Sequence, residues 1–416
     1  MAWWKEPTKG QWFTLLAAWV GWILDAFDFT IFLFVIPEIS KEFGVTYTST
    51  AGAITATLLM RLLGGVAAGS LADKYGRKLP LMLSLVWFAI FDGAIAFAPS
   101  FFVVMVCRTL FGFGMGAEWT AGTTLAMENW PKRSRGIASG ILQGSWAIGY
   151  LLAGLVAGWI GPTYGWRALF LVAAAPALLV LPIRIWVPES EEWKLEQVTK
   201  PAAVERKTRA SLRSVFGKLS WGSAMMGAGL AAYYALTGLY PTVLKVELHL
   251  DPSAVGGIVA FFNIGMMIGS ICCGWLAAKR SVALAVMIPA LCVIPFLPLY
   301  TGELQGMLTL GAFFGGFFGA GYAGVTPMML ATLFPAEVRA RATGIVYHVG
   351  AFGAAFVPMA MTAFSSSFGV TLAQVMMYTV AVFQVVLVGL LALRPKELRE
   401  KPGAEVGALA ASGLAH

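Results

Sequence analysis

Six charged residues lie inside long apolar stretches in the first half of the chain. They are Asp25, Asp28, Arg61, Asp92, Arg108 and Glu118. A charged group is costly to bury in an apolar environment, so such residues are candidates for function by default. The competing interpretation is that they pair with one another and hold helices together. Because the four acids outnumber the two arginines, at least one carboxyl lacks a fixed cation and tends to keep its proton.

Candidate roles follow from these side chains. Asp25, Asp28 and Glu118 are candidate proton carriers. Arg61 is the candidate for binding an anion, because a guanidinium can hold a carboxylate through two parallel hydrogen bonds. The alternative for Arg61 is a salt bridge to Asp28 or Glu118, and the sequence leaves both interpretations open.

The second half contributes one ionisable residue of this kind and several uncharged candidates. His348 could titrate near neutral pH, or it could be a histidine hydrogen-bonded inside the helices. Further residues that could line a substrate cavity, or serve only in packing, are Tyr233, Tyr234, Thr237 and Asn263. The ionisable groups therefore place proton coupling and anion binding mainly in the first half.

The stretches that carry these residues are long enough to cross a membrane. Hydrophobic residues make up 58% of the 416 positions and charged residues 12%, about half the charge of a soluble domain. A spanning helix needs about 20 apolar residues, so this composition predicts about a dozen spans. The first five expected spans lie at about 13–36, 49–68, 79–99, 101–127 and 136–160, and the sixth ends at about 187. The other six lie at about 221–245, 253–278, 282–299, 305–333, 343–364 and 371–393.

The net charge of +8 is distributed as in a membrane protein, not as in a nucleic-acid-binding protein. Assigning the loops to alternate sides puts 24 of the 29 Lys and Arg residues on one side. Since positive residues mark cytoplasmic loops, both termini are predicted to be cytoplasmic. A rise of about 1.5 Å per residue places Asp25, Asp92 and Arg108 in one layer of the membrane core.

One short basic segment between the second and third spans carries a specific pattern. It reads Gly69-Ser-Leu-Ala-Asp73-Lys-Tyr-Gly76-Arg77-Lys78. Gly76 suits a turn with positive φ, and Gly69 would let a neighbouring helix approach closely. The pattern resembles the loop between spans two and three of the major facilitator superfamily. That resemblance implies a gate in which Asp73 and Arg77 latch the two halves of the protein in one of two states.

An internal repeat supports a chain built from two similar halves. Residues 130–140 align with 334–344 at an offset of 204, and 69–72 align with 274–277 at an offset of 205. Arg135, in the first copy of the longer repeat, is a further gating candidate. The superfamily resemblance implies an all-α integral membrane protein with 12 transmembrane helices in two six-helix pseudo-symmetric halves.

The expected domain plan follows from the spans and the polar segment between them. Residues 1–188 form the first six-helix half, and residues 221–394 form the second. Residues 189–220 form a polar cytoplasmic connector with a surface helix at about 191–198. Residues 395–416 form a Gly/Ala-rich cytoplasmic tail of the kind that stays disordered.

A closer resemblance is to the sialate:proton symporter group, which holds bacterial sialic acid permeases and fungal lactate permeases. It rests on Leu24-Asp-Ala-Phe-Asp-Phe29, Arg61 with Gly64-Gly65, Glu128-Asn-Trp-Pro-Lys132, and Gly165-Trp-Arg-Ala-Leu-Phe170. The segment Arg108–Gly116 also resembles the superfamily's span-four motif, which ties Arg108 to proton transfer. The chain lacks the two extra spans of many sialic acid permeases. It also has Tyr233–Gly238 where lactate permeases carry His, Gln and Asp.

These resemblances imply proton-coupled uptake of an organic carboxylate, either a small monocarboxylate such as lactate or sialic acid. The alternatives are a proton-driven efflux antiporter of the same fold and a membrane sensor that binds without transporting. No nucleophile–base pair, phosphate loop or metal cluster is apparent, so neither an enzyme nor a cofactor or metal is predicted. The expected partners are a small organic anion, protons and the lipid bilayer. The expected form is a monomer in a bacterial inner membrane.

Overall fold

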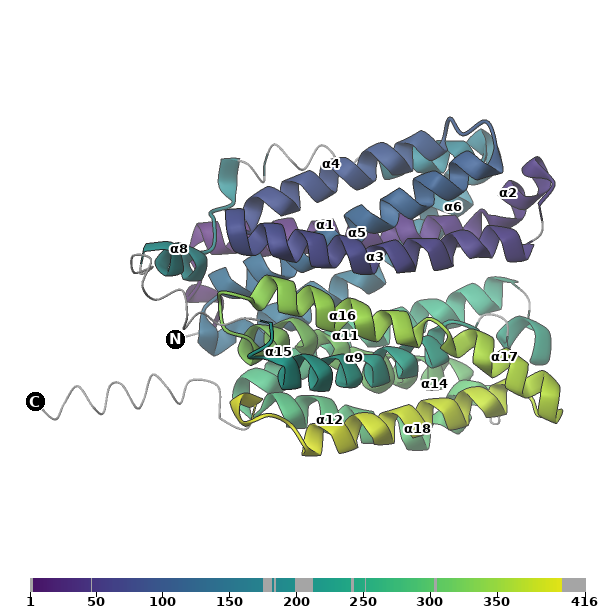
Figure 1. The fold of residues 1–416 in the computed structure, drawn as a ribbon. Helices are drawn as coiled ribbons and strands as arrows, with labels where there is room; N and C mark the ends of the chain where they lie inside the picture. Colours follow the sequence, from purple (N-terminus) through teal and green to yellow (C-terminus); the bar gives the residue numbers. More distant parts are fainter. Residues whose placement is uncertain are drawn as a thin grey trace, which may run out of the picture.

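The computed structural model describes residues 3–45, 47–174, 182, 185–198, 212–240, 243–250, 252–302 and 305–398. Every regular element within these ranges is a helix. Figure 1 shows two groups of roughly parallel helices, one from each half of the chain. The first group contains α1 (Lys9–Phe34), α2 (Ile36–Phe43), α3 (Tyr47–Tyr75), α4 (Lys78–Ile95), α5 (Phe101–Asn129) and α6 (Arg135–Ala173).

The second group begins after a short helix, α8 (Glu191–Val198), which lies at one end of the bundle (Figure 1). This helix was expected from the sequence at the same residues. The second group contains α9 (Phe216–Thr237), α11 (Pro252–Lys279), α12 (Val282–Cys292), α13 (Leu297–Thr301), α14 (Leu308–Phe314), α15 (Thr326–Leu333), α16 (Arg339–Ala354), α17 (Val357–Phe368) and α18 (Leu372–Ala392).

The helices agree with the expected spans, with local differences. Nine helical stretches of the described residues are long and apolar enough to cross a membrane. Most of the expected sixth span and of the tail, together with residues 199–211 of the connector, lies outside the described residues. α9 ends at Thr237 instead of continuing to about 245, and a π-helix follows at Val243–Glu247.

A break at Gly165 lies inside α6, after the expected end of span five. Gly165 adopts φ 77° and ψ 172° there, which L side chains rarely adopt. The expected spans nine, ten and eleven are each interrupted. Pro289 lies inside α12, a π-helix at Gly315–Ala320 follows α14, and a short break separates α16 from α17. Such interruptions are tolerated where neighbouring helices re-satisfy the freed backbone groups.

The two halves contact each other through glycines at equivalent positions of the repeat. A Cβ on Gly140 of α6 would overlap the carbonyl oxygen of Ser270 in α11. A Cβ on Gly344 of α16 would lie 2.6 Å from the carbonyl oxygen of Gly65 in α3. Gly140 and Gly344 occupy equivalent positions at the offset of 204. The pairs α6–α11 and α16–α3 are therefore pseudo-symmetric close contacts between the halves.

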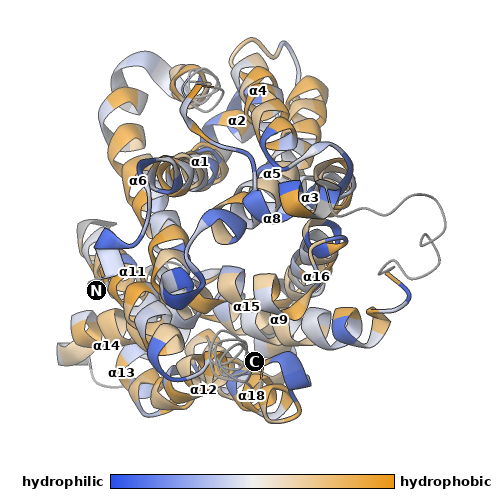
Figure 2. Cartoon of the chain, turned by 90° about the vertical axis from the view of Figure 1, so that its left-hand side faces the viewer, coloured by the Kyte–Doolittle hydropathy of each residue, from blue (hydrophilic) through white to orange (hydrophobic). Residues whose placement is uncertain are grey.

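Polar and apolar surfaces are separated along the bundle. Figure 2 views the end that carries α8 and the turn after α3, called here the hairpin end. Hydrophilic segments gather around α8 at this end, and the surrounding helices are mostly hydrophobic. Large apolar side chains such as Trp159, Phe102 and Phe97 are highly exposed. This distribution fits helices whose outer faces contact lipid.

Candidate functional site

A cavity of about 780 Å³ lies among helices of both halves. Five residues predicted to bind substrate line it: Arg61, Tyr233, Tyr234, Thr237 and Asn263. The sixth, His348, is 1% exposed, and its Nε2 lies 3.3 Å from the carbonyl oxygen of Gly116. His348 is not among the residues that line the cavity. The volume is typical of small-molecule sites.

Arg61 extends from α3 to the cavity and is 3% exposed. Its guanidinium carbon lies 5.5 Å from the ring centroid of Trp22 and 5.4 Å from that of Tyr347. Its Nη2 lies 4.0 Å from Oδ2 of Asp25, so the pairing acid is Asp25 and not Asp28 or Glu118. Within the described residues, Arg61 Nε and Nη2 have no hydrogen-bond partner. Apart from the 4.0 Å ion pair with Asp25, this buried edge of the guanidinium has hydrogen-bonding capacity left for an anion.

The predicted coupling residues are buried around Arg61 and Arg108. Asp25, Asp28 and Arg108 are 0% exposed and Glu118 is 1% exposed. Arg108 Nη1 donates a 3.2 Å hydrogen bond to Oδ1 of Asp92, as a layer of paired charges predicts. Both carboxyl oxygens of Asp28 lack a hydrogen-bond partner among the described residues. With two arginines for four acids, the group balances its charge only when protons occupy two of the acids.

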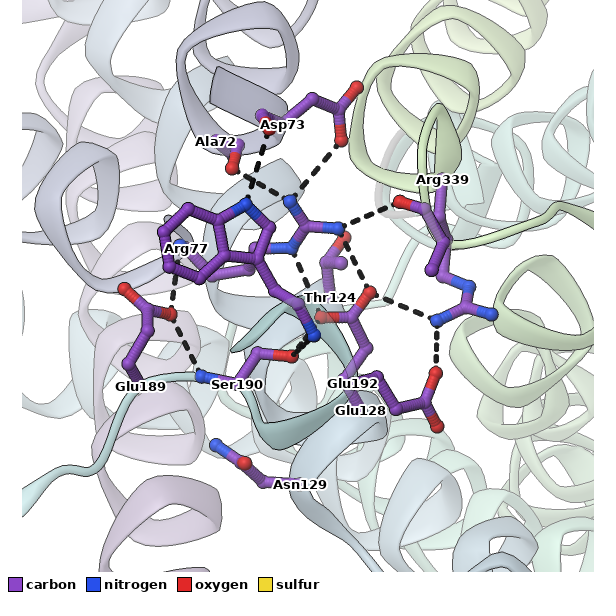
Figure 3. Close-up of polar contacts among 12 residues, drawn as sticks. Ala72, Asp73, Arg77, Thr124, Glu128, Asn129, Glu189, Ser190, Glu192 and Arg339 are labelled. Carbon is purple, nitrogen blue, oxygen red and sulfur yellow. Dashed lines mark hydrogen bonds and ion pairs between the residues drawn. The ribbon is translucent and has the colours of Figure 1, made fainter. Parts of the chain in front are cut away.

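The hairpin end holds a network of ion pairs around Arg77 (Figure 3). Arg77 is 0% exposed, and its Nε and Nη2 donate to the carboxylate of Glu128 at 3.0 and 3.1 Å. Its Nη1 lies 3.4 Å from Asp73 Oδ1. Its Nη2 also donates to the carbonyl oxygen of Ala336, in the second half of the chain, at 3.0 Å. Arg77 thus joins the two halves at this end.

Both hairpin glycines have the properties expected of them. Gly76 has φ 96°, and Gly69 packs so tightly that a Cβ would lie 2.6 Å from Cα of Arg341 in α16. The backbone N–H of Arg341 donates to Oδ2 of Asp73 at 3.3 Å. Gly69 and Asp73 therefore contact α16, whereas Gly76 lies against the side chain of Glu189.

Glu192 of α8 bridges equivalent arginines of the two repeats. Arg135 Nη2 donates to Glu192 Oε1 at 2.9 Å, and Arg339 Nη1 donates to Glu192 Oε2. Each arginine also donates to the carbonyl oxygen five residues before it, Arg135 to Trp130 and Arg339 to Phe334. Arg339 Nη1 donates further to Glu128 at 3.0 Å.

Three members of this network, Glu128, Glu192 and Arg339, were not among the predicted gating residues. A signal for Arg339 was present, because the repeat offset of 204 places it at the position of Arg135. Glu128 opens the segment Glu128–Lys132 that carries the family resemblance, but no role was assigned to it, and Glu192 had no comparable signal. Their roles depend on how far-separated segments meet.

The contact of α8 with both halves should weaken in acid. Burial disfavours the ionised form of Glu192, but the charges of Arg339 and Arg135 outweigh it, so its pKa lies below the ordinary value. A depressed pKa contributes stability that is present above about pH 4.3 and lost as the pH falls through the folded value. We expect the fluorescence of Trp193, in α8, to change in this acid range. The variant Trp193→Phe shows which part of the fluorescence comes from Trp193. Glu192→Gln should abolish the acid-induced change in fluorescence, and Glu191→Gln should keep it. A transition unchanged in Glu192→Gln would contradict this assignment.

Comparison with known proteins gives consistent matches. The model of the Major Facilitator Superfamily matches residues 18–303 and 225–414. The sialic acid transporter NanX of Escherichia coli (strain K12) is 28% identical over 377 residues, 88% of this chain and 91% of that protein. A probable 4-methylmuconolactone transporter of Cupriavidus pinatubonensis (strain JMP 134 / LMG 1197) is 32% identical over 84% of this chain and 82% of that protein. The solved structure of the proton:xylose symporter XylE bound to 6-bromo-6-deoxy-D-glucose has the same fold. It has a TM-score of 0.76 at 17% identity and covers 92% of this chain and 94% of that one.

Proposed function

The chain belongs to the Major Facilitator Superfamily, and we propose that it imports an organic carboxylate together with protons by alternating access. The superfamily consists of membrane transporters, so the chain is an integral membrane transporter and not an enzyme. The observation that carries the proposal is that Arg61 Nε and Nη2 have no hydrogen-bond partner among the described residues, in a cavity lined by both halves. The two similar transporters are named for sialic acid and 4-methylmuconolactone, and both compounds carry a carboxyl group.

In this proposal the charges of the cavity couple the two fluxes. An anion on Arg61 and a proton on Asp25, Asp28 or Glu118 together leave the buried net charge unchanged. Reorientation with only one of the two bound would carry an unbalanced charge through an apolar core, which is costly. Arg108 holds the acid layer in place through Asp92. Only the fully loaded and the empty carrier therefore reorient readily.

The network at the hairpin end acts as the gate in this proposal. Asp73, Arg77 and Arg135 were predicted for this role, and each contacts a residue of the second half or of α8. The hairpin end would face the cytoplasm, as the distribution of Lys and Arg predicts. The protein would act as a monomer in a bacterial inner membrane, with both termini in the cytoplasm.

Uptake into proteoliposomes with an alkaline interior tests the proposal. From a panel of labelled carboxylates that includes sialic acid, lactate and benzoate, we expect at least one to accumulate above the level in protein-free liposomes and to leak out with a protonophore. Losing a charge-assisted bidentate contact costs about 1.5–3 kcal/mol, so Arg61→Gln should reduce uptake at low substrate concentration by about 10- to 100-fold. Arg61→Lys keeps the positive charge but not the forked guanidinium, so its uptake should lie between that of the parent and that of Arg61→Gln.

Arg167→Gln is the matched control, because Arg167 is partly exposed, pairs with Glu42, and neither residue lines the cavity. It should transport like the parent. Uptake opposed by an inward proton gradient would instead identify an efflux antiporter. Binding without accumulation would identify a sensor. Normal uptake by Arg61→Gln would remove Arg61 from the binding site.

A further inference from the structure

We propose that the cavity selects a planar aromatic monocarboxylate over a polyhydroxylated sugar acid, a small aliphatic acid or a dicarboxylate. This inference rests on the proposed function, since it names the substrate class of the same site. Of the 35 residues that line the cavity, 12 are aromatic, whereas aromatic residues make up 13% of the chain. Aromatic faces are therefore concentrated where the substrate would bind.

The carboxylate end is defined by three buried donor atoms. Arg61 Nε and Nη2 and Trp22 Nε1 have no hydrogen-bond partner among the described residues. Both side chains line the cavity and are 3% exposed. Buried donors are almost always satisfied in proteins, so three together indicate a ligand with oxygen acceptors. A carboxylate supplies those acceptors and the negative charge that faces Arg61.

One carboxylate is accommodated, but not two. Arg61 is the one charged side chain among the described residues that line the cavity. Asp25, 4.0 Å from Arg61, already offsets part of its positive charge. A second carboxylate on the same substrate would lie among aromatic and methionine side chains without a cation, which is costly.

The remainder of the cavity offers flat faces and sulfur atoms. The rings of Trp22 and Trp146 lie 4.8 Å apart between centroids, and those of Tyr233 and Tyr234 lie 5.7 Å apart. Trp146, Tyr233 and Tyr234 are only partly buried, so part of each ring remains accessible. Four methionines also line this space. Rings and thioethers both interact favourably with an aromatic ring.

Several polar groups of the cavity are committed to the protein itself, whereas Thr30 Oγ1, Gln143 Oε1 and the Tyr240 hydroxyl have no hydrogen-bond partner among the described residues. Thr237 Oγ1 donates to the carbonyl oxygen of Tyr233 at 2.8 Å, and Asn263 Nδ2 donates to that of Val259 at 3.0 Å. The hydroxyls of Tyr300 and Tyr322 likewise donate to backbone carbonyls at 2.8 Å. A sugar acid would exchange the water around its many hydroxyls for these three unpartnered atoms, fewer than its hydroxyls need. An aromatic ring carries no such groups.

Equilibrium binding to the purified full chain in detergent, measured by isothermal titration calorimetry, tests this selectivity without a membrane. Benzoate is compared with cyclohexanecarboxylate, which has the same charge and a similar size but no aromatic face. We expect benzoate to bind about five- to tenfold more tightly. Terephthalate adds a second carboxylate to benzoate and should bind at least about tenfold more weakly. Sialic acid and lactate should also bind more weakly than benzoate.

Two tryptophan variants localise the effect. Trp146→Leu should bring the benzoate-to-cyclohexanecarboxylate ratio close to one. Trp159→Leu should keep the ratio of the parent, because Trp159 is 82% exposed on the outer surface. If Trp146→Leu does not fold, the relative affinities of the same ligands for the parent protein still test the inference. Equal or tighter binding of cyclohexanecarboxylate, terephthalate or sialic acid would overturn the inference. The proposed function would then still stand if that ligand accumulates with protons. Failure of all uptake would overturn the proposed function but would leave the binding preference measured in detergent unchanged.

Discussion

Replacing Glu128 with glutamine is expected to open the hairpin end of the protein. Glu128 is 4% exposed and accepts hydrogen bonds from Arg77, Arg339 and Ser190. Without its charge, two buried arginines lose their shared carboxylate. Breaking a buried ion pair by removing one partner costs about 3–5 kcal/mol. Even the lower value would shift the balance between closed and open hairpin ends by about a hundredfold.

Hydrogen exchange followed by mass spectrometry measures this opening. The backbone N–H of Arg341 donates to Asp73 across the boundary between the halves, so exchange in peptides covering the start of α16 reports separation. We expect faster exchange there and a lower thermal unfolding temperature in Glu128→Gln. Glu191→Gln is the matched control, because Glu191 pairs with Lys194 on the surface, where an ion pair contributes about 0–1 kcal/mol. Equal exchange in Glu128→Gln and the parent would show that Glu128 does not hold the gate.

Replacing Asp28 with asparagine is expected to uncouple transport from the proton gradient. Asp28 is fully buried, and neither carboxyl oxygen has a hydrogen-bond partner among the described residues. Asparagine keeps the shape of the aspartate side chain but cannot bind and release a proton. A gradient of one pH unit stores about 1.4 kcal/mol per proton, enough for about tenfold accumulation of a co-transported substrate. The parent should approach this ratio and Asp28→Asn should remain near one.

Two assays separate lost coupling from lost binding. Exchange of labelled for unlabelled substrate at equal pH should persist in Asp28→Asn, because it needs no net proton movement. Thr14→Val, in the same helix, removes a buried hydroxyl that hydrogen-bonds only to the backbone of Gly10, and it should behave like the parent. Accumulation by Asp28→Asn equal to the parent would transfer the coupling role to Asp25 or Glu118.

The sequence by itself determined the membrane architecture, because the signals are local and strong. A long apolar run is a sufficient reason for a helix in lipid, where every backbone group must be satisfied within the segment. The special backbone of Gly76 and the tight contact at Gly69 were also predictable. In both cases the chain geometry requires a residue without Cβ. The repeat also aligns Arg339 with Arg135, and both arginines donate to Glu192 in the structure.

The pairing of buried charges was decided only by the tertiary structure. Arg61 could reach several acids from its position in the sequence, and the rotation and crossing of the helices bring it to Asp25. Helix periodicity does not encode this choice, because nearly every face of these helices is apolar. The aromatic character of the cavity depends on the same packing, since its rings come from helices far apart in the chain.

The gate shows the same limit. Glu128 lies 51 residues from Arg77 and 211 residues from Arg339, and it meets both only because α3, α5 and α16 end at one place. A lone acid at the end of a span carries no signal of two distant arginines. Its role follows from electrostatics once the bundle is assembled, because a carboxylate that is removed from water needs cations around it.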